Sequence, residues 1–228
     1  MLDLLLLIYI NRTMAYEPKY DYIPPFEFHP LTRIYDFVLI FAGFGKKFRE
    51  KIVNSVEIKN ADKVLDVGCG TGMFLKLLKE KHDGVEAIGI DPDKGALEIA
   101  TKRLTKFKDV KLIRGFGETL PFEDETFDIV FSTLAFHHMP TDIKQKAIKE
   151  IFRVLKKGGK LAIVDFGTAR HHRFYKIILF WEPFEYIKSN LDGVITKFME
   201  EVGFKNVQED SIKFPIIHLF RGEKLFIK

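Results

Sequence analysis

The feature that most constrains the fold is an alternation of short apolar runs with amphipathic segments between residues 63 and 166. The runs are rich in β-branched and other apolar residues, as buried parallel strands require. In chain order they read KVLDV, EAIGID, VKLIRG, FDIVFST and KLAIVDF. Because helical patterns stand between most of these runs, the alternation predicts a parallel sheet covered on both faces and joined by right-handed crossovers.

The helical segments have apolar residues at helical spacing, as Phe74, Leu77 and Leu78 illustrate. Thr141 is expected to cap one helix, and Gly158–Gly159 to end it. The expected helices span 73–81, 94–106 and 143–155.

The C-terminal part follows a different pattern. A helix over 192–202 is closed by Gly203, and two strands near 206–212 and 216–221 follow with no helix between them. Such a pair adds an antiparallel hairpin to the sheet. The expected fold is therefore α/β: a seven-stranded, mostly parallel Rossmann-like sheet with helices on both faces and a C-terminal antiparallel hairpin.

Residues 1–60 are expected to form an N-terminal extension with lid helices over 31–44 and 48–56, ahead of a main domain at 61–228. The opening MLDLLLLIYI is too short to span a bilayer and lacks the charged start and cleavage site of a secretory signal. Our hypothesis is that Met14 is the natural start or that residues 1–13 are dispensable. Mass spectrometry of the native N-terminus tests it.

Charge and cysteine content exclude some classes. The chain has 36 basic and 32 acidic residues without a basic cluster, which argues against a nucleic-acid partner. A single cysteine, Cys69, excludes a disulfide framework and a cysteine-rich zinc site, and it fits a cytoplasmic location. No metal site is expected. The 23 Phe residues indicate a large core or an apolar pocket, and the core is favoured.

The stretch VLDVGCGTG carries Asp66, Gly68 and Gly70 at the end of the first expected strand. Ligands of open α/β sheets bind beyond the carboxyl ends of the strands, and glycine lets the backbone approach them closely. Asp91 ends the second strand about 20 residues later, the spacing of a carboxylate that holds ribose hydroxyls. Together these residues predict a ribonucleoside site.

The type of nucleoside follows from what the loop lacks. Met73 stands where a dinucleotide site needs its third glycine, and the Gly-Lys-Ser/Thr ending of a P-loop is absent. The pattern D-x-G-x-G-x-G resembles the first motif of class I S-adenosylmethionine-dependent methyltransferases. Residues 115–139 and 151–166 resemble later motifs of the small-molecule branch. The tail from Gly203 more weakly resembles the menaquinone and ubiquinone biosynthesis methyltransferases.

The resemblance implies S-adenosylmethionine as cofactor and assigns residues to its parts. Asp66, Gly68, Gly70 and Thr71 would surround the methionine moiety, and Asp91 would bind the ribose. The adenine end and the methyl-donor end would be lined by Pro92, Phe116, Gly117 and Thr133. The family often has Asp or Asn where this chain has Phe116, so Phe116 would stack on the base while Glu118 or a backbone group supplies the polar contact.

The acceptor side is less specified. His137 and His138 are candidate general bases, with a structural role in the loop as the alternative. The aromatic stretch 174–187, in a cover insert at about 170–190, either joins residues 16–41 as a lid over an apolar acceptor or packs as core or as a homodimer interface. An apolar lid suggests peripheral contact with a membrane.

Two classes of function remain at this point. The first is methyl transfer to a small, apolar or aromatic acceptor, and the second is a non-catalytic nucleoside-binding regulatory module on the same fold. A nicotinamide dehydrogenase is disfavoured by Met73.

Overall fold

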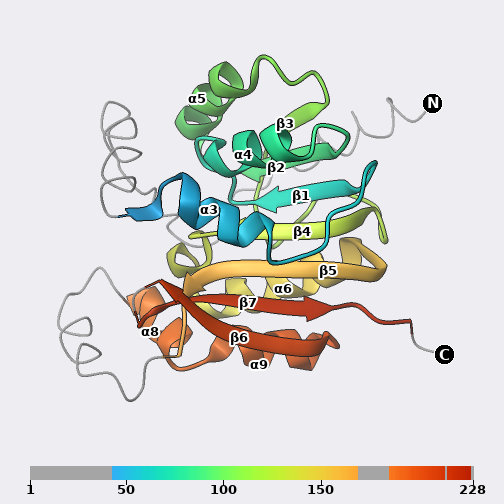
Figure 1. The fold of residues 1–228 in the computed structure, drawn as a ribbon. Helices are drawn as coiled ribbons and strands as arrows, with labels where there is room; N and C mark the ends of the chain where they lie inside the picture. The colour runs from blue at the N-terminus through green and yellow to red at the C-terminus, as the bar shows by residue number, and fades with distance from the viewer. Residues whose placement is uncertain (1–42, 169–184, 214, 227–228) are drawn as a thin grey trace.

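The computed structural model describes residues 43–168, 185–213 and 215–226, and its centre is one seven-stranded sheet (Figure 1). The strand order is β3-β2-β1-β4-β5-β7-β6. All pairs from β3 to β5 are parallel, whereas β7 runs antiparallel to both β5 and β6. The strands are β1 (Lys63–Val67), β2 (Glu86–Asp91), β3 (Val110–Arg114), β4 (Phe127–Thr133), β5 (Leu155–Phe166), β6 (Lys205–Lys213) and β7 (Ile217–Glu223). The mostly parallel sheet with its C-terminal antiparallel hairpin is confirmed.

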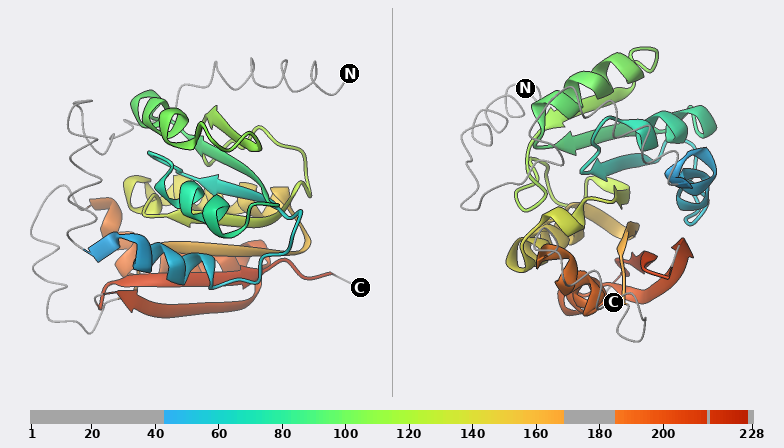
Figure 2. Two further views of the ribbon diagram at one scale, coloured as in Figure 1. Left: turned by 45° about the horizontal axis from the view of Figure 1, so that its top comes forward. Right: turned by 90° about the vertical axis from the view of Figure 1, so that its left-hand side faces the viewer.

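Helices cover both faces of this sheet (Figure 2). One face packs against α3, α4 and α5, and the other packs against α6 and α9. A short 3-10 turn and α8 lie near the carboxyl end of β5. The bounds are α3 (Lys46–Val53), α4 (Met73–Lys81), α5 (Lys94–Leu104), η2 (Phe136–His138), α6 (Thr141–Val154), α8 (Glu185–Leu191) and α9 (Val194–Val202).

Alternation along the strands explains the two-sided core. In β1, Val64 joins the cluster under α3 and α4, and Leu65 joins the cluster under α6 and α9. Both side chains have no exposed surface. Successive side chains of a strand point to opposite faces, so Asp66 shares the face of Val64. The first polar residue of the strand end therefore lies on the side of α3 and α4.

Two local predictions around α6 are wrong. Thr141 does not cap this helix, because Pro140 occupies the N-cap position and Thr141 is the first helical residue. Gly158–Gly159 does not end it either, since the helix stops at Val154 and β5 begins at once. The glycine pair lies inside β5, where Gly158 N–H donates to the Lys224 carbonyl and Gly159 carbonyl accepts from Lys224 N–H. The long strand pairing overrides the usual role of glycine after a helix.

Several predicted segments fall wholly or mostly outside the described residues. They are the opening apolar run, the lid helix over 31–44 and the greater part of the cover insert at 170–190. The second N-terminal helix is described as α3, which is shorter than the predicted span. None of the helices in the three described ranges is both long and apolar enough to cross a bilayer.

Candidate active site

The glycine loop and Asp91 form one hydrogen-bonded unit at the carboxyl ends of β1 and β2. The N–H groups of Gly68 and Cys69 donate to the Ile90 carbonyl, at 2.8 and 3.1 Å. Asp91 Oδ2 accepts from Gly70 N–H at 2.8 Å, and its Oδ1 accepts from Asp93 N–H at 2.9 Å. The carboxylate is therefore held beside the loop by backbone donors on both sides.

Asp66 is a buried carboxyl group without a hydrogen-bond partner. Only 1% of its surface is exposed, and neither oxygen is hydrogen-bonded. Burial, followed by the charge of Asp91, raises the pKa of Asp66 to about 8, although the cation of Arg49 acts in the opposite direction. Burial likewise raises the pKa of Asp91 to about 6, against the effect of its two backbone donors. An unpartnered buried acid at a strand end favours a cationic ligand group.

The backbone around the glycine loop is closely packed on one side and open on the other. Gly68 has φ +74°, and a Cβ at this position would lie 2.4 Å from the Cβ of Ala135. Gly70 has φ +52°, and a Cβ there would meet nothing within 4 Å. The loop after β4 therefore lies directly against Gly68, while Gly70 borders open space.

The other predicted cofactor residues lie around this unit. Gly117 approaches the end of β1, because a Cβ there would lie 3.1 Å from Val67 Cγ1. Thr133 ends β4, and its hydroxyl is buried without a partner. Thr71 and Glu118 are buried. Pro92 and Phe116 are half-buried.

His137 lies in η2, two residues beyond Ala135, and its ring faces the buried carboxylate of Asp165 at the end of β5. His137 Nδ1 is 3.1 and 3.2 Å from the two Asp165 oxygens, and its backbone N–H donates to Oδ2 at 3.3 Å. The His137 side chain is 14% exposed, whereas Asp165 is fully buried. The imidazole is thus held by Asp165, while a small part of the side chain stays exposed.

Three elements converge on Asp165. Its Oδ1 accepts from Asn190 Nδ2 of α8 at 3.0 Å and from Phe166 N–H at 2.8 Å. Burial acts to raise the pKa of Asp165, but His137, Phe166 N–H and the nearby cation of Lys144 outweigh it and lower that pKa. Asp165 is consequently a buried carboxylate that stays ionised.

The ring of His138 lies against that of His137 at an interplanar angle of 41°, but its environment differs. The ring centroids are 4.0 Å apart. Burial, helped by the charges of His137 and Lys144, lowers the pKa of His138 to about 3 despite the opposing effect of Asp165. A base this weak is a poor proton acceptor near neutrality. The structure therefore separates the two predicted histidines, and His137 is the better candidate base.

Comparison with known proteins assigns the family. A family model described as a methyltransferase domain matches residues 65–163. A demethylmenaquinone methyltransferase of Thermotoga maritima is 32% identical over 218 residues, covering 86% of this chain and 90% of the relative. The chain belongs to the S-adenosylmethionine-dependent methyltransferases. A ubiquinone/menaquinone biosynthesis C-methyltransferase of Xanthomonas oryzae pv. oryzae is also 32% identical, over 66% of this chain and 61% of the relative.

Solved structures agree with the methyltransferase fold. A phosphoethanolamine N-methyltransferase of Haemonchus contortus, determined with S-adenosyl-L-methionine, matches with a TM-score of 0.69 and 19% identity. The match covers 80% of this chain and 53% of that longer protein. A methyltransferase structure from Thermotoga maritima gives a TM-score of 0.65 at 22% identity, over 86% and 98% of the two chains. The predicted class and cofactor, S-adenosylmethionine, are confirmed.

The residues at the strand ends of this methyltransferase fit its cofactor. S-adenosylmethionine carries an ammonium, a carboxylate and a sulfonium but no phosphate, and the unpartnered Asp66 suits the cationic groups. The open side of Gly70 leaves room for a ligand beside the backbone. Asp91 keeps further acceptor capacity for hydroxyl groups after its two backbone bonds.

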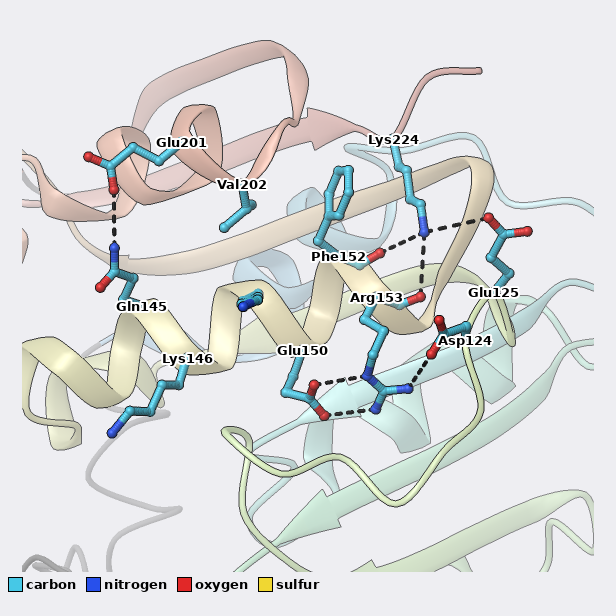
Figure 3. Close-up of a pocket in the computed structure, with 11 residues that line it drawn as sticks. Asp124, Glu125, Gln145, Lys146, Glu150, Phe152, Arg153, Glu201, Val202 and Lys224 are labelled. Carbon is cyan, nitrogen blue, oxygen red and sulfur yellow. Dashed lines mark hydrogen bonds and ion pairs between the residues drawn. The ribbon is translucent and has the colours of Figure 1, made fainter. Parts of the chain in front are cut away.

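A pocket of the methyltransferase lies at the other end of the sheet, where the parallel strands begin (Figure 3). Charged residues that line the pocket form ion pairs with one another, as Arg153 does with Glu150 and Asp124. Lys224 donates to the carbonyls of Phe152, Arg153 and Leu155 at the end of α6. These contacts satisfy a helix terminus, so this pocket has a structural explanation. Within the three described ranges, no three side chains of His, Cys, Asp or Glu gather as metal ligands.

Sequence reasoning missed four groups at the methyltransferase site. Asp165 ends a predicted strand, so the same strand-end rule that found Asp91 could have found it. Asn190 and Lys144 gave no such signal, because they reach the cluster from helices. Arg49 of α3 is 8% exposed, and its Nη2 lies 3.5 Å from Met73 Sδ at the start of α4.

Proposed function

We propose that this methyltransferase methylates a small, apolar aromatic acceptor whose reacting position first loses a proton to His137. The observation that carries the proposal is the position of His137. Its ring is held by a buried carboxylate and lies two residues from Ala135, which touches the glycine loop. A general base is needed only for acceptors that must be deprotonated, such as phenols and activated ring carbons.

The cofactor roles follow from the positions of the strand-end residues. Asp66, Gly68, Gly70 and Thr71 hold the amino-acid end, and Asp91 holds the ribose. The cofactor, once bound, supplies a methyl group on a positively charged sulfur that is already a good leaving group. Positioning and exclusion of water by the protein then supply much of the remaining catalysis. The adenine end and the methyl-donor end are assigned to Pro92, Phe116, Gly117, Glu118 and Thr133.

The acceptor class is supported by the relatives. Those matched over most of their length are named for demethylmenaquinone, an apolar compound with an aromatic ring system. We infer an acceptor of this kind, a reduced hydroxylated ring with an apolar substituent. Because such a compound dissolves in lipid, the proposal includes a peripheral contact with a membrane surface.

The cover of the acceptor is part of the same proposal. We propose that residues 16–41 and the insert at about 170–190 cover the acceptor, whereas α3, also within residues 1–60, packs in the core against the sheet. The contact of α8, at the end of that insert, with η2 supports this role. Homodimer formation through the insert is the alternative for its apolar residues. Gel filtration with light scattering tests the alternative, since a dimer interface requires a dimeric protein.

Methyl transfer to a defined acceptor tests the proposal. The full chain is incubated with S-adenosylmethionine labelled in its methyl group and with an alkylated dihydroxynaphthalene, a catechol or an aliphatic amine. We expect label in the dihydroxynaphthalene and none in the amine, with Asp142→Asn as an active control because Asp142 lies exposed on α6. Tight binding of S-adenosylhomocysteine with no transfer to any hydroxylated ring would instead support a non-catalytic module.

A further inference from the structure

Asp165 and His137 are 28 positions apart in the chain and come from different strand ends. β5 contributes Asp165, and the segment after β4 contributes His137. Asp165 forms hydrogen bonds with both the ring Nδ1 and the backbone N–H of His137. The position and the rotation of the imidazole are therefore fixed. Burying the carboxylate of Asp165 is costly, and these hydrogen bonds offset that cost.

We propose that Asp165 is the positioning residue of the methyl-transfer reaction, which holds His137 with Nδ1 protonated and leaves Nε2 as the proton acceptor. The inference rests on the proposed function, because it assigns the base that function requires. Asn190 of α8 supports this arrangement, since its side-chain amide donates a hydrogen bond to one oxygen of Asp165.

The tautomer follows from the hydrogen-bonding capacity of the two groups. An ionised carboxylate can only accept hydrogen bonds. Nδ1 of His137 must therefore donate to Asp165, and the lone pair of the neutral ring is left on Nε2. No described residue forms a hydrogen bond with Nε2. This nitrogen is the one that remains available to an acceptor.

Against the effect of burial, His137 does most to lower the pKa of Asp165, followed by the Phe166 N–H and then by the cation of Lys144. His138, whose ring lies against that of His137, is kept neutral by burial. From α6, the fully buried Lys144 donates to the Tyr186 carbonyl and to Ser189 Oγ of α8, and its cation acts on Asp165. From β7, His218 stands opposite Asp165 in the register but is bound to Glu209 at 2.7 Å.

The chemical step is a simple proton transfer. The O–H or activated C–H bond of the acceptor breaks, and its electron pair stays on the acceptor as the nucleophile. The proton forms a bond with the lone pair of Nε2, which makes the ring an imidazolium. Asp165 stabilises that cation through the Nδ1–H bond and does not take the proton itself. The proton leaves to water when the product departs.

Nuclear magnetic resonance of the histidine rings tests the assignment without any turnover. In ¹⁵N-labelled full chain, two-bond proton–nitrogen spectra report which ring nitrogen carries the proton, and His137→Gln identifies the signal. We expect wild-type His137 to be protonated at Nδ1 when neutral. In Asp165→Asn the side-chain amide can donate as well as accept, so the other tautomer of His137 becomes populated.

Kinetics provide the second readout. In Asp165→Asn, kcat falls about 100-fold, whereas the KM for cofactor changes by less than about twofold. His137→Gln combined with Asp165→Asn costs no more than His137→Gln alone. The matched control Asp142→Asn removes the same charge from an exposed site of α6 and leaves both readouts unchanged.

Two results would overturn the inference. One is a wild-type His137 that carries its proton on Nε2, which is measured on the unmodified protein and so does not depend on whether a variant folds. The other is an Asp165→Asn protein whose His137 keeps the wild-type tautomer. If the histidine signals behave as expected while no acceptor is methylated, the proposed function fails and only the orientation of His137 by Asp165 stands.

Discussion

The carboxylate of Asp91 and the backbone N–H of Gly70 are joined by a hydrogen bond of 2.8 Å. The bond links the ends of two neighbouring strands, so the carboxylate that we propose to bind ribose and the loop that we propose to bind the amino-acid end are positioned together. The predictions below examine this unit and the elements that support it.

Replacing Asp91 with alanine is expected to weaken S-adenosylhomocysteine binding by about 10-fold to 100-fold, since hydrogen bonds to a charged group contribute about 1.5–3 kcal/mol. Asp91→Asn should have a smaller effect, because its amide oxygen can still accept from Gly70 N–H. Titration calorimetry measures both variants. Equal affinity in wild type and Asp91→Ala would show that the ribose lies elsewhere.

Asp66 is expected to lower the stability of the ligand-free protein at high pH. Its pKa of about 8 is above the value of the unfolded chain, so the folded protein retains a proton that the unfolded chain loses. The contribution of Asp66 to stability is complete below about pH 4 and is lost as the pH rises through 8. Asp66→Asn has no such loss.

Thermal unfolding between pH 6 and pH 9 checks this prediction. The Tm of Asp66→Asn should exceed that of wild type, and the difference should grow as the pH rises toward 8. Each kcal/mol of difference in the free energy of unfolding corresponds to about 2–4 °C in Tm. The same variant should bind S-adenosylhomocysteine less tightly, because an amide does not attract the ammonium group. A constant difference in Tm across this range would contradict the raised pKa.

Alanine substitutions at Gly68 and Gly70 should separate folding from binding. Gly68→Ala is expected to destabilise the protein by about 1–3 kcal/mol, since the new methyl group collides with Ala135 at a positive φ. Gly70→Ala meets no neighbour and carries only the strain of its φ, about 1–2 kcal/mol. Its methyl group instead enters the space assigned to the cofactor.

Urea unfolding and calorimetry on the same two variants provide the measurement. Gly70→Ala should lose the greater share of cofactor affinity, and Gly68→Ala the greater share of stability. The reverse order would mean that the ligand lies against Gly68.

The strands were predictable because their signals are local. KVLDV, EAIGID and FDIVFST coincide with β1, β2 and β4, since each is a short buried run bounded by polar or glycine residues. Asp66 and Asp91 followed from the strand ends. In contrast, Gly158–Gly159 was misread because the long pairing of β5 with β7 is a contact between distant segments.

The environment of the histidines was not predictable either. Because His137 and His138 are adjacent in the sequence, both were equal candidates for the general base. In the structure, His137 contacts the carboxylate of Asp165, whereas burial lowers the pKa of His138. That difference depends on where β5 ends and on how α6 and α8 pack, which no local pattern encodes.

Lys224 is expected to be structural. Lys224→Met leaves the carbonyls of Phe152, Arg153 and Leu155 without their donor, so the free energy of unfolding should fall by about 1–3 kcal/mol. Lys146→Met is the matched control, because Lys146 lines the same pocket but forms only an exposed pair, worth about 0.5 kcal/mol or less. Neither change should alter methyl transfer, and a lower kcat in Lys146→Met would give that pocket a role in catalysis.

Calorimetric titration of the full chain with S-adenosylhomocysteine, run beside an identical titration with NAD⁺, tests the central claim most directly. The strand-end carboxylates and the glycine loop predict one S-adenosylhomocysteine per chain and no heat of binding with NAD⁺. An absence of binding by S-adenosylhomocysteine, or equal binding of both nucleotides, would contradict the account.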